Sequence, residues 1–276
     1  MIEPRISEVM PIARVALWVT TVGALTVALR SVAMGPPPFW FAIAATFVYL
    51  ALCGFGVAFP RCEMYANVIA SGPAGRSRVA LTFDDGPDPR TTPKVLVALR
   101  EHNCKATFFV IARKVEQYPE LVHSIIQDGH ELGLHGYAHD RLTAWRAPSW
   151  IVEDIRKAQA VLLQLTQQEV FWYRPPIGHV SPRTAEAVRK ADVELVAWSV
   201  RCLDGVRSAT PERVLACVKH KLRDGAIVML HDASERGNFE PASVRAINAI
   251  LETIALRGLV SVTLSQLLAD EETLPQ

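Results

Sequence analysis

The chain has 276 residues, a formal net charge of +1 and a pI of about 7.7. This leaves room for one sizeable domain with an appendage and excludes a strongly basic nucleic-acid-binding surface. Half of the residues are hydrophobic, and the excess lies at the N-terminus. The five cysteines are odd in number and include no CxxC pair, so neither a disulfide framework nor a thiolate metal site is expected.

Two apolar runs near the N-terminus are long enough to cross a bilayer, whose core takes roughly 20 apolar residues. Residues 15–29 and residues 39–59 contain no charge. The run at 15–29 could instead belong to a signal peptide. A Gly-Pro-Pro-Pro turn lies between the two runs. The expected parts of the chain are a transmembrane hairpin (1–64), a linker (65–77), a globular domain (78–270) and a tail (271–276).

Arginines near the two runs bear on the side of the membrane at which the large domain lies. If both runs span, the N-terminus and the domain share one side, and the turn on the other side carries only Arg30. The arginines on the shared side are Arg5, Arg14, Arg61, Arg76 and Arg78. The positive-inside rule then favours a cytoplasmic domain, but the side reverses if the first run does not span.

Beyond the linker, short apolar runs alternate with helical segments, which predicts parallel strands covered by helices. The expected strands are residues 78–83, 106–111, 131–135, 170–173, 194–199, 226–230 and 259–262. The expected helices are residues 93–102, 119–128, 149–166, 182–190, 211–222, 242–256 and 264–270. Several helices begin with a capping residue and Pro, as at Ser181-Pro182 and Thr210-Pro211. Seven such units predict an α/β near-barrel, one unit short of the eightfold arrangement.

Polar residues follow the predicted strands, and the C-terminal ends of parallel strands meet on one face. Asp84 and Asp85 follow the first strand, where one carboxylate can bind a metal and the other can act as a base. His135 and His139 are spaced i and i+4 and could hold the same metal. With Asp85 they form a His-His-carboxylate set that is typical of a catalytic metal site.

Further strand ends carry three more candidates. Arg174 precedes a rigid Pro-Pro turn and could hold a carboxylate such as Asp84. His231 follows a strongly apolar strand and could protonate a leaving group, with Asp204 to orient it. Judged alone, each could equally be a salt-bridge, turn or hydrogen-bonded structural residue. Their convergence on one face is what predicts a metal-dependent hydrolase.

The motifs resemble those of the carbohydrate esterase family 4 polysaccharide deacetylases, the NodB-homology family. The resemblance covers about residues 78–270 and depends on five motifs in the family's order. They are TFDDGP at 82–87, the His135 and His139 pair, RPPIG at 174–178, Asp204 after Trp-Ser-Val, and LHD at 230–232. It implies a distorted (β/α)7 barrel that binds one divalent metal, often zinc, with manganese, cobalt or nickel as alternatives.

The resemblance also implies a reaction, the metal-dependent removal of an N-acetyl group from an amino sugar in a polysaccharide, oligosaccharide or other glycan. In that reaction Asp85, His135 and His139 would be the metal ligands, and Asp84 would be the general base. The implied partners are therefore an N-acetylated sugar and, through the hairpin, a membrane, with no nucleic acid.

The remaining site residues receive supporting roles from the same resemblance. His231 would be the general acid and would be tuned by Asp204. Arg174 would hold Asp84 in place. The backbone N–H of Ile177 would help to stabilise the oxyanion.

The chain departs from the family pattern at four positions. Arg201 stands where many members have Asp, Gly205 where many have Trp, Ile177 where Tyr is frequent, and Gly136 where Ser or Thr is frequent. None of these changes removes a predicted ligand, base or acid, but Arg201 and Gly205 alter the edge of the expected cleft. Three other functions stay open: deacylation or deformylation of a lipid-linked sugar, a catalytically inactive carbohydrate-binding membrane protein, and an unrelated metallohydrolase such as a phosphatase.

Overall fold

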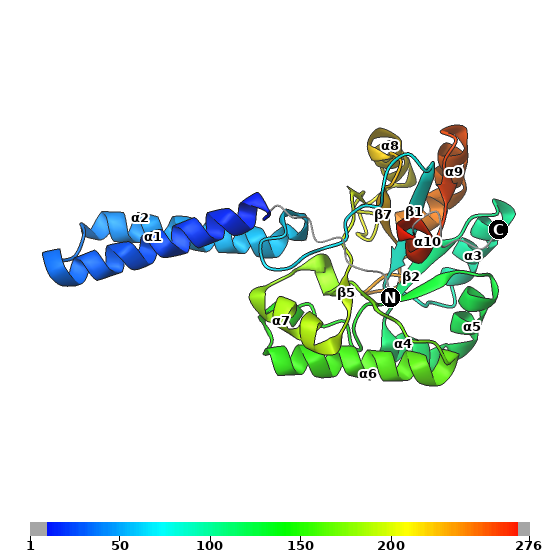
Figure 1. Cartoon of the computed structure of the whole chain (residues 1–276). Helices are drawn as coiled ribbons and strands as arrows, with labels where there is room; N and C mark the ends of the chain where they lie inside the picture. The colour runs from blue at the N-terminus through cyan, green and yellow to red at the C-terminus, as the bar shows by residue number, and fades with distance from the viewer. Residues whose placement is uncertain (1–9, 270–276) are drawn as a thin grey trace.

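In the structure, a computed structural model that describes residues 10–269, a long helical hairpin projects from a barrel of short strands (Figure 1). The hairpin consists of α1 (Ile12–Met34) and α2 (Phe39–Ala58), with 23 and 20 residues. Both helices are long and apolar enough to cross a membrane. The expected tail at 271–276 lies outside the described residues.

The hairpin helices contact each other but leave nearly all of their apolar surface exposed. Gly56 is the only buried residue in α2, and α1 has none. A polar contact joins the helices, since Thr21 Oγ1 lies 3.1 Å from the Tyr49 hydroxyl. Arg14 in α1 donates a 3.0 Å hydrogen bond to the carbonyl of Glu63, which follows α2 in the chain. An exposed apolar surface of this extent is typical of a segment that contacts a membrane or another protein.

Eight strands lie in the described part of the chain, and every pairing between them is parallel. They are β1 (Arg78–Asp84), β2 (Ala106–Val110), β3 (Glu131–Leu134), β4 (Trp172–Tyr173), β5 (Glu194–Leu195), β6 (Val200–Arg201), β7 (Ile227–His231) and β8 (Val260–Ser261). The order is β5-β4-β3-β2-β1-β7-β6, with β8 beside β1. The predicted α/β barrel is confirmed as a parallel, curled and incomplete barrel of β/α units.

The expected strand at 194–199 is two short strands, because this segment changes its pairing partner. The N–H of Val196 bonds the carbonyl of Tyr173 in β4, and three residues later the N–H of Ser199 bonds the carbonyl of Ile227 in β7. The segment therefore connects the two ends of the strand order and curls the sheet into a barrel.

Helices cover the outside of the barrel, as the alternation of patterns predicts (Figure 1). They are α3 (Thr92–Glu101), α4 (Ala112–Gln117), α5 (Pro119–Gln127), α6 (Pro148–Thr166), α7 (Pro182–Ala191), α8 (Pro211–Lys221), α9 (Ala242–Leu256) and α10 (Leu264–Leu268). The side chains of Ser181 and Thr210 cap α7 and α8, as their Ser-Pro and Thr-Pro signals indicate. Helix α4 was not among the expected elements, because six residues are too few for a clear helical period.

The segment expected to be a linker, residues 65–77, lies partly within the barrel. Ile69 forms a parallel bridge with Val196, and Ser71 forms an antiparallel bridge with Ala226. Val68 is buried in the hydrophobic core. The segment between the hairpin and β1 is therefore bonded to the strands that close the barrel.

A disulfide joins Cys202, directly after β6, to Cys217 in α8. The expectation that the cysteines form no disulfide was wrong. The two residues are 15 positions apart in the chain, but the fold places their Cα atoms 5.7 Å apart, within the usual range for a disulfide. The other cysteines of the described chain, Cys53, Cys62 and Cys104, are free.

Candidate active site

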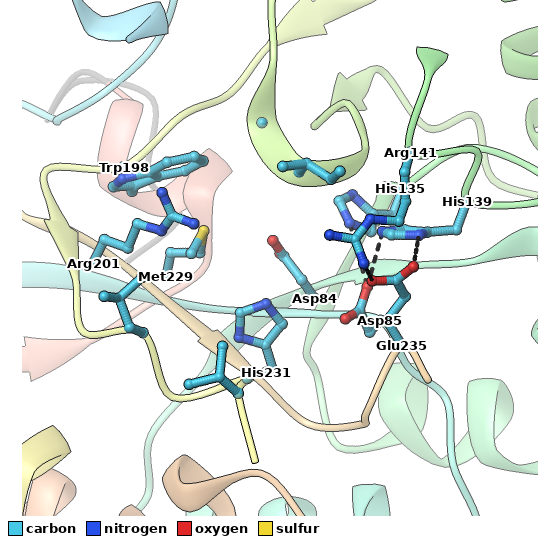
Figure 2. Close-up of a pocket in the computed structure, with 15 residues that line it drawn as sticks. Asp84, Asp85, His135, His139, Arg141, Trp198, Arg201, Met229, His231 and Glu235 are labelled. Carbon is cyan, nitrogen blue, oxygen red and sulfur yellow. Dashed lines mark hydrogen bonds and ion pairs between the residues drawn. The ribbon is translucent and has the colours of Figure 1, made fainter. Parts of the chain in front are cut away.

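The predicted site residues meet at the C-terminal ends of the strands, around a pocket of about 140 Å³ (Figure 2). Asp84 ends β1 and lies opposite His231, which ends β7, in the strand register. Four more of the predicted residues line the same pocket: Asp85, His135, His139 and Ile177. Arg174 and Asp204 lie behind the lining, fully buried.

Asp85, His135 and His139 form a group that fits a divalent metal. Their possible ligand atoms all lie within 4.8 Å of one another. Asp85 Oδ1 is 3.5 Å from His135 Nε2 and 3.3 Å from His139 Nε2. This oxygen is buried and has no hydrogen-bond partner, which is costly unless a cation completes its surroundings. Two imidazoles and one carboxylate are the donor set of open zinc sites.

The protonation of Asp85 and His139 also suits a metal, whereas for His135 burial is outweighed by the charges of Asp84 and Asp85, which raise the pKa. Burial raises the pKa of the Asp85 carboxyl, but the close contact with His135 and the charges of nearby histidines outweigh burial, so its pKa is lowered overall. Burial, together with the charge of His135, lowers the pKa of His139 to about 3. The site therefore offers an anionic carboxylate and a neutral imidazole, the forms in which these groups bind metals.

The second ring nitrogen of each histidine lies near an oxygen atom, and for His135 the two atoms are within hydrogen-bond distance. His135 Nδ1 lies 2.7 Å from the carbonyl oxygen of Arg174. This carbonyl can only accept, so Nδ1 carries the proton and Nε2 is free to coordinate. His139 Nδ1 lies 3.4 Å from Oε1 of Glu235, in the loop after β7. Sequence reasoning missed Glu235, because no motif or strand end marks it.

Positive φ angles in residues other than glycine recur at the pocket. Asp85 has φ 74°, His139 has φ 55° and Ile177 has φ 63°. Such conformations cost of order 1–3 kcal/mol each and persist where the surrounding structure fixes them, which is common in active sites. The chain therefore holds these side chains at the pocket at some cost in stability.

Arg174 and Asp84 form a buried ion pair, as the sequence predicts. Arg174 Nη1 donates to Asp84 Oδ1 at 2.6 Å, and the two side chains are 0% and 4% exposed. The guanidinium also bonds the carbonyls of Val196 and Ala197 and lies 4.1 Å from the ring centroid of Phe109. The buried Arg174 guanidinium therefore holds the Asp84 side chain at the pocket and neutralises its charge.

His231 is held by Asp204 through two contacts. Its backbone N–H donates to Asp204 Oδ2 at 2.7 Å, and its Nδ1 lies 3.1 Å from Oδ1. Burial lowers the pKa of His231, but the charge and hydrogen bond of Asp204, with smaller contributions from Asp85 and Asp84, raise it to about 10 overall. The imidazole therefore carries a proton at neutral pH, with Nδ1 directed at Asp204.

The opposite side of the pocket comes from the segment that closes the barrel and the loop after it. Trp198 and Arg201 lie on that side in Figure 2, away from the two metal-site histidines. A Cβ on Gly205 would come within 2.8 Å of His231 Nδ1, so this position has no room for a side chain beside the imidazole. Gly178 also has no room for a side chain, because an added Cβ would lie 2.3 Å from the Trp198 ring.

Comparison with known proteins identifies the class to which this fold and site belong. The family model described as polysaccharide deacetylase matches residues 71–196. The chain is 32% identical over 211 residues to a peptidoglycan-N-acetylglucosamine deacetylase of Bacillus cereus, covering 76% of this chain and 75% of the relative. This chain therefore belongs to the polysaccharide deacetylase family, which carbohydrate esterase family 4 and the NodB-homology name also denote.

Two further similarities support the membership. A chitooligosaccharide deacetylase of Bradyrhizobium is 33% identical, over 70% of this chain and 92% of the relative. The crystal structure of the Bc1960 peptidoglycan N-acetylglucosamine deacetylase superposes with a TM-score of 0.68 at 30% identity, covering 76% of this chain and 96% of that one. The expectation of an enzyme of the deacetylase class is confirmed, and the fold expected from the sequence is that of its relatives.

Proposed function

We propose that this protein is a metal-dependent hydrolase that removes the N-acetyl group from an amino sugar of a glycan. The observation that carries the proposal is the placement of three groups around one pocket: the Asp85, His135 and His139 donors, the ion-paired Asp84, and His231 bound to Asp204. A metal, a base and an acid around one pocket are sufficient for the metal-assisted hydrolysis of an amide.

A divalent metal bound by Asp85, His135 and His139 would supply Lewis-acid polarisation and stabilisation of developing negative charge. Zinc is the proposed metal, because the site offers two imidazoles and a single carboxylate. The same donors can also accept manganese, cobalt or nickel.

The residues of the chain then supply the proton transfers. Asp84 accepts a proton from the attacking water, and Arg174 keeps its carboxylate in place. The water oxygen bonds to the acetamide carbon, and the Ile177 N–H stabilises the oxyanion. His231 gives its proton to the sugar nitrogen as the carbon–nitrogen bond breaks. The products are acetate and a free amino sugar.

The direct test is acetate release by the full chain in detergent, with chitooligosaccharide or peptidoglycan as substrate. We expect acetate in the presence of zinc, its loss after a chelator removes the metal, and its return when zinc is added back. Acetate release that is unaffected by complete removal of metal would contradict the proposal. A protein that binds zinc stoichiometrically but deacetylates no acetamido sugar would favour the carbohydrate-binding alternative.

We further propose that α1 and α2 span a membrane as a hairpin, which their length, apolar composition and exposure support. The arginine pattern favours a cytoplasmic domain, whereas the Cys202–Cys217 disulfide favours an oxidising compartment. We give the disulfide more weight, since Arg76 and Arg78 lie 18 and 20 residues beyond Ala58, at the limit of the distance over which the arginine rule applies. Reporter fusions at the C-terminus test this: activity of a cytoplasmic reporter would contradict the placement on the oxidising side.

A further inference from the structure

The end of the hairpin that meets the barrel is bonded to two segments beside the pocket. The carbonyl of Val57, in the last turn of α2, accepts a 3.2 Å hydrogen bond from the N–H of Val180. Arg61, in the 3-10 turn after α2, donates from Nη1 to the carbonyl of Ser199 at 3.4 Å. The hairpin is thus attached to the loop after β4 and to the segment between β5 and β6.

Both attachment points are close in the chain to residues that line the pocket. Val180 is two residues from Gly178, and Ser199 is next to Trp198; Gly178 and Trp198 line the pocket. When the hairpin spans a bilayer, the pocket therefore lies at the end of the domain that is near the membrane surface.

The rim of the pocket is apolar on the side of the loop after β6. Leu203 and Val206 line the pocket and are 56% and 49% exposed. The disulfide between Cys202 and Cys217 ties the start of this loop to α8. Exposed apolar side chains at the rim of a site are suited to an apolar part of a ligand or to the bilayer interior.

Arg201 adds a positive charge at the same rim. Its side chain is exposed, lines the pocket and lies 5.3 Å from the centroid of the Trp198 ring. Within the described residues no carboxylate forms an ion pair with Arg201, whereas Arg141, also at the pocket, is paired with Glu235 at 3.3 Å. An unpaired guanidinium supported by an aromatic ring is suited to bind a phosphate.

We propose that the substrate is an acetamido sugar joined through phosphate to a membrane lipid and taken from the bilayer surface. This inference rests on the proposed deacetylase function and names its substrate class. The acetamide would lie at Asp84 and His231, the phosphate at Arg201, and the start of the lipid chain along Leu203 and Val206. Only the amide bond is cleaved, and the sugar–phosphate bond stays intact.

The test uses the full chain in phospholipid vesicles and measures acetate release from three substrates. They are N-acetylglucosamine joined through diphosphate to a polyprenol in the same vesicles, the water-soluble sugar diphosphate without lipid, and neutral chitooligosaccharide. We expect kcat/KM for the lipid-linked sugar to be at least about 10-fold above that for each of the other two, because phosphate and lipid each add contacts.

Arg201→Gln isolates the contribution of the phosphate contact. We expect it to raise KM for the two diphosphate substrates by roughly 10- to 100-fold, the usual effect of losing a charge-assisted hydrogen bond. The ratio of kcat/KM for the diphosphates to that for chitooligosaccharide should fall by the same factor. The matched control is Arg207→Gln, an exposed arginine farther along the same loop that does not line the pocket; it should leave the ratio unchanged.

Three outcomes would overturn the inference while leaving the deacetylase function standing. They are equal kcat/KM for the lipid-linked sugar and for chitooligosaccharide, an Arg201→Gln variant with an unchanged substrate ratio, and a preference for peptidoglycan, whose stem-peptide carboxylates are other anions that Arg201 could bind. Absence of acetate from all of these substrates, peptidoglycan included, would instead contradict the proposed function itself.

Discussion

The two walls of the pocket are built differently. On the side of β1, β3 and β4 the polar side chains are buried: Arg174 is ion-paired with Asp84, and the two histidines lie within 3.5 Å of Asp85. On the side of β6 and its loop, Arg201 is exposed without an ion-pair partner among the described residues, and apolar side chains line the rim. Buried, fixed charge is what an amide hydrolysis requires, whereas an exposed rim selects what enters.

The largest expected effect on activity comes from a change on the side of the pocket formed by β1, β3 and β4. Asp84→Asn should lower kcat by about 10²–10⁴-fold, because the variant loses its general base. It should still bind zinc, since the ligands are intact. The change also leaves the buried Arg174 charge without its partner, which is expected to lower the free energy of unfolding by about 3–5 kcal/mol. Kinetics, metal content and thermal unfolding should therefore be measured together; a wild-type kcat would exclude Asp84 as the base.

The next effect concerns the pH dependence set by Asp204. Asp204 raises the pKa of His231 to about 10, so the general acid stays protonated to high pH. In Asp204→Asn the pKa should fall toward 6.5, and the basic limb of the pH–rate profile should move to lower pH with a loss of about 10²-fold at pH 9. An unmoved basic limb would show that His231 is not the acid.

The same pair has a consequence for stability. Because folding raises the pKa of His231, its stabilisation is fully present below about pH 6.5 and is lost as the pH rises through about 10. Between these two pH values, the unfolding temperature of the wild type should therefore fall by more than the unfolding temperature of Asp204→Asn.

Gly205, in the loop after β6, lies beside His231, so a substitution there tests how closely this loop packs against the imidazole. Gly205→Ala would place a methyl group within 2.8 Å of His231 Nδ1 and displace the imidazole. We expect kcat to fall by roughly 10- to 100-fold with zinc binding unchanged. The control is Gly23→Ala in α1, where nothing lies within 4 Å of the added Cβ. Equal activity of the two variants would mean that the loop moves to accommodate the methyl group and leaves His231 in place.

The smallest expected effect is that of Glu235, which contacts His139 from the loop after β7. Glu235→Gln should weaken zinc binding by about 10-fold, because an oriented imidazole is a better ligand. Competition with a chelator measures this directly. Glu240→Gln, which removes a carboxylate paired with Lys94 farther along the same loop, is the matched control. Equal zinc affinities in both variants would leave Glu235 without a positioning role.

What the sequence predicts well are features that local order determines. The apolar runs give β1, β2, β3 and β7 within one or two residues, and the polar residues after the runs converge on the pocket as expected. Capping residues followed by Pro place the starts of α7 and α8. These predictions succeed because strand ends in a parallel barrel share one face.

What the sequence does not predict depends on contacts between distant segments. The division of 194–199 into β5 and β6 follows from a change of partner that the apolar run does not reveal. The Cys202–Cys217 disulfide and the contact of Glu235 with His139 need the loops to be placed first. The bonds from the hairpin to Val180 and Ser199 join parts more than 100 residues apart in the chain.

The most direct test of the account is to measure zinc content and acetate release together in the full chain and in His135→Ala. We expect one zinc per wild-type chain and metal-dependent acetate release. We expect neither in His135→Ala, with thermal unfolding still cooperative, because this change removes one of three ligands. A folded His135→Ala variant that keeps full deacetylase activity would contradict the metal site and, with it, the central claim.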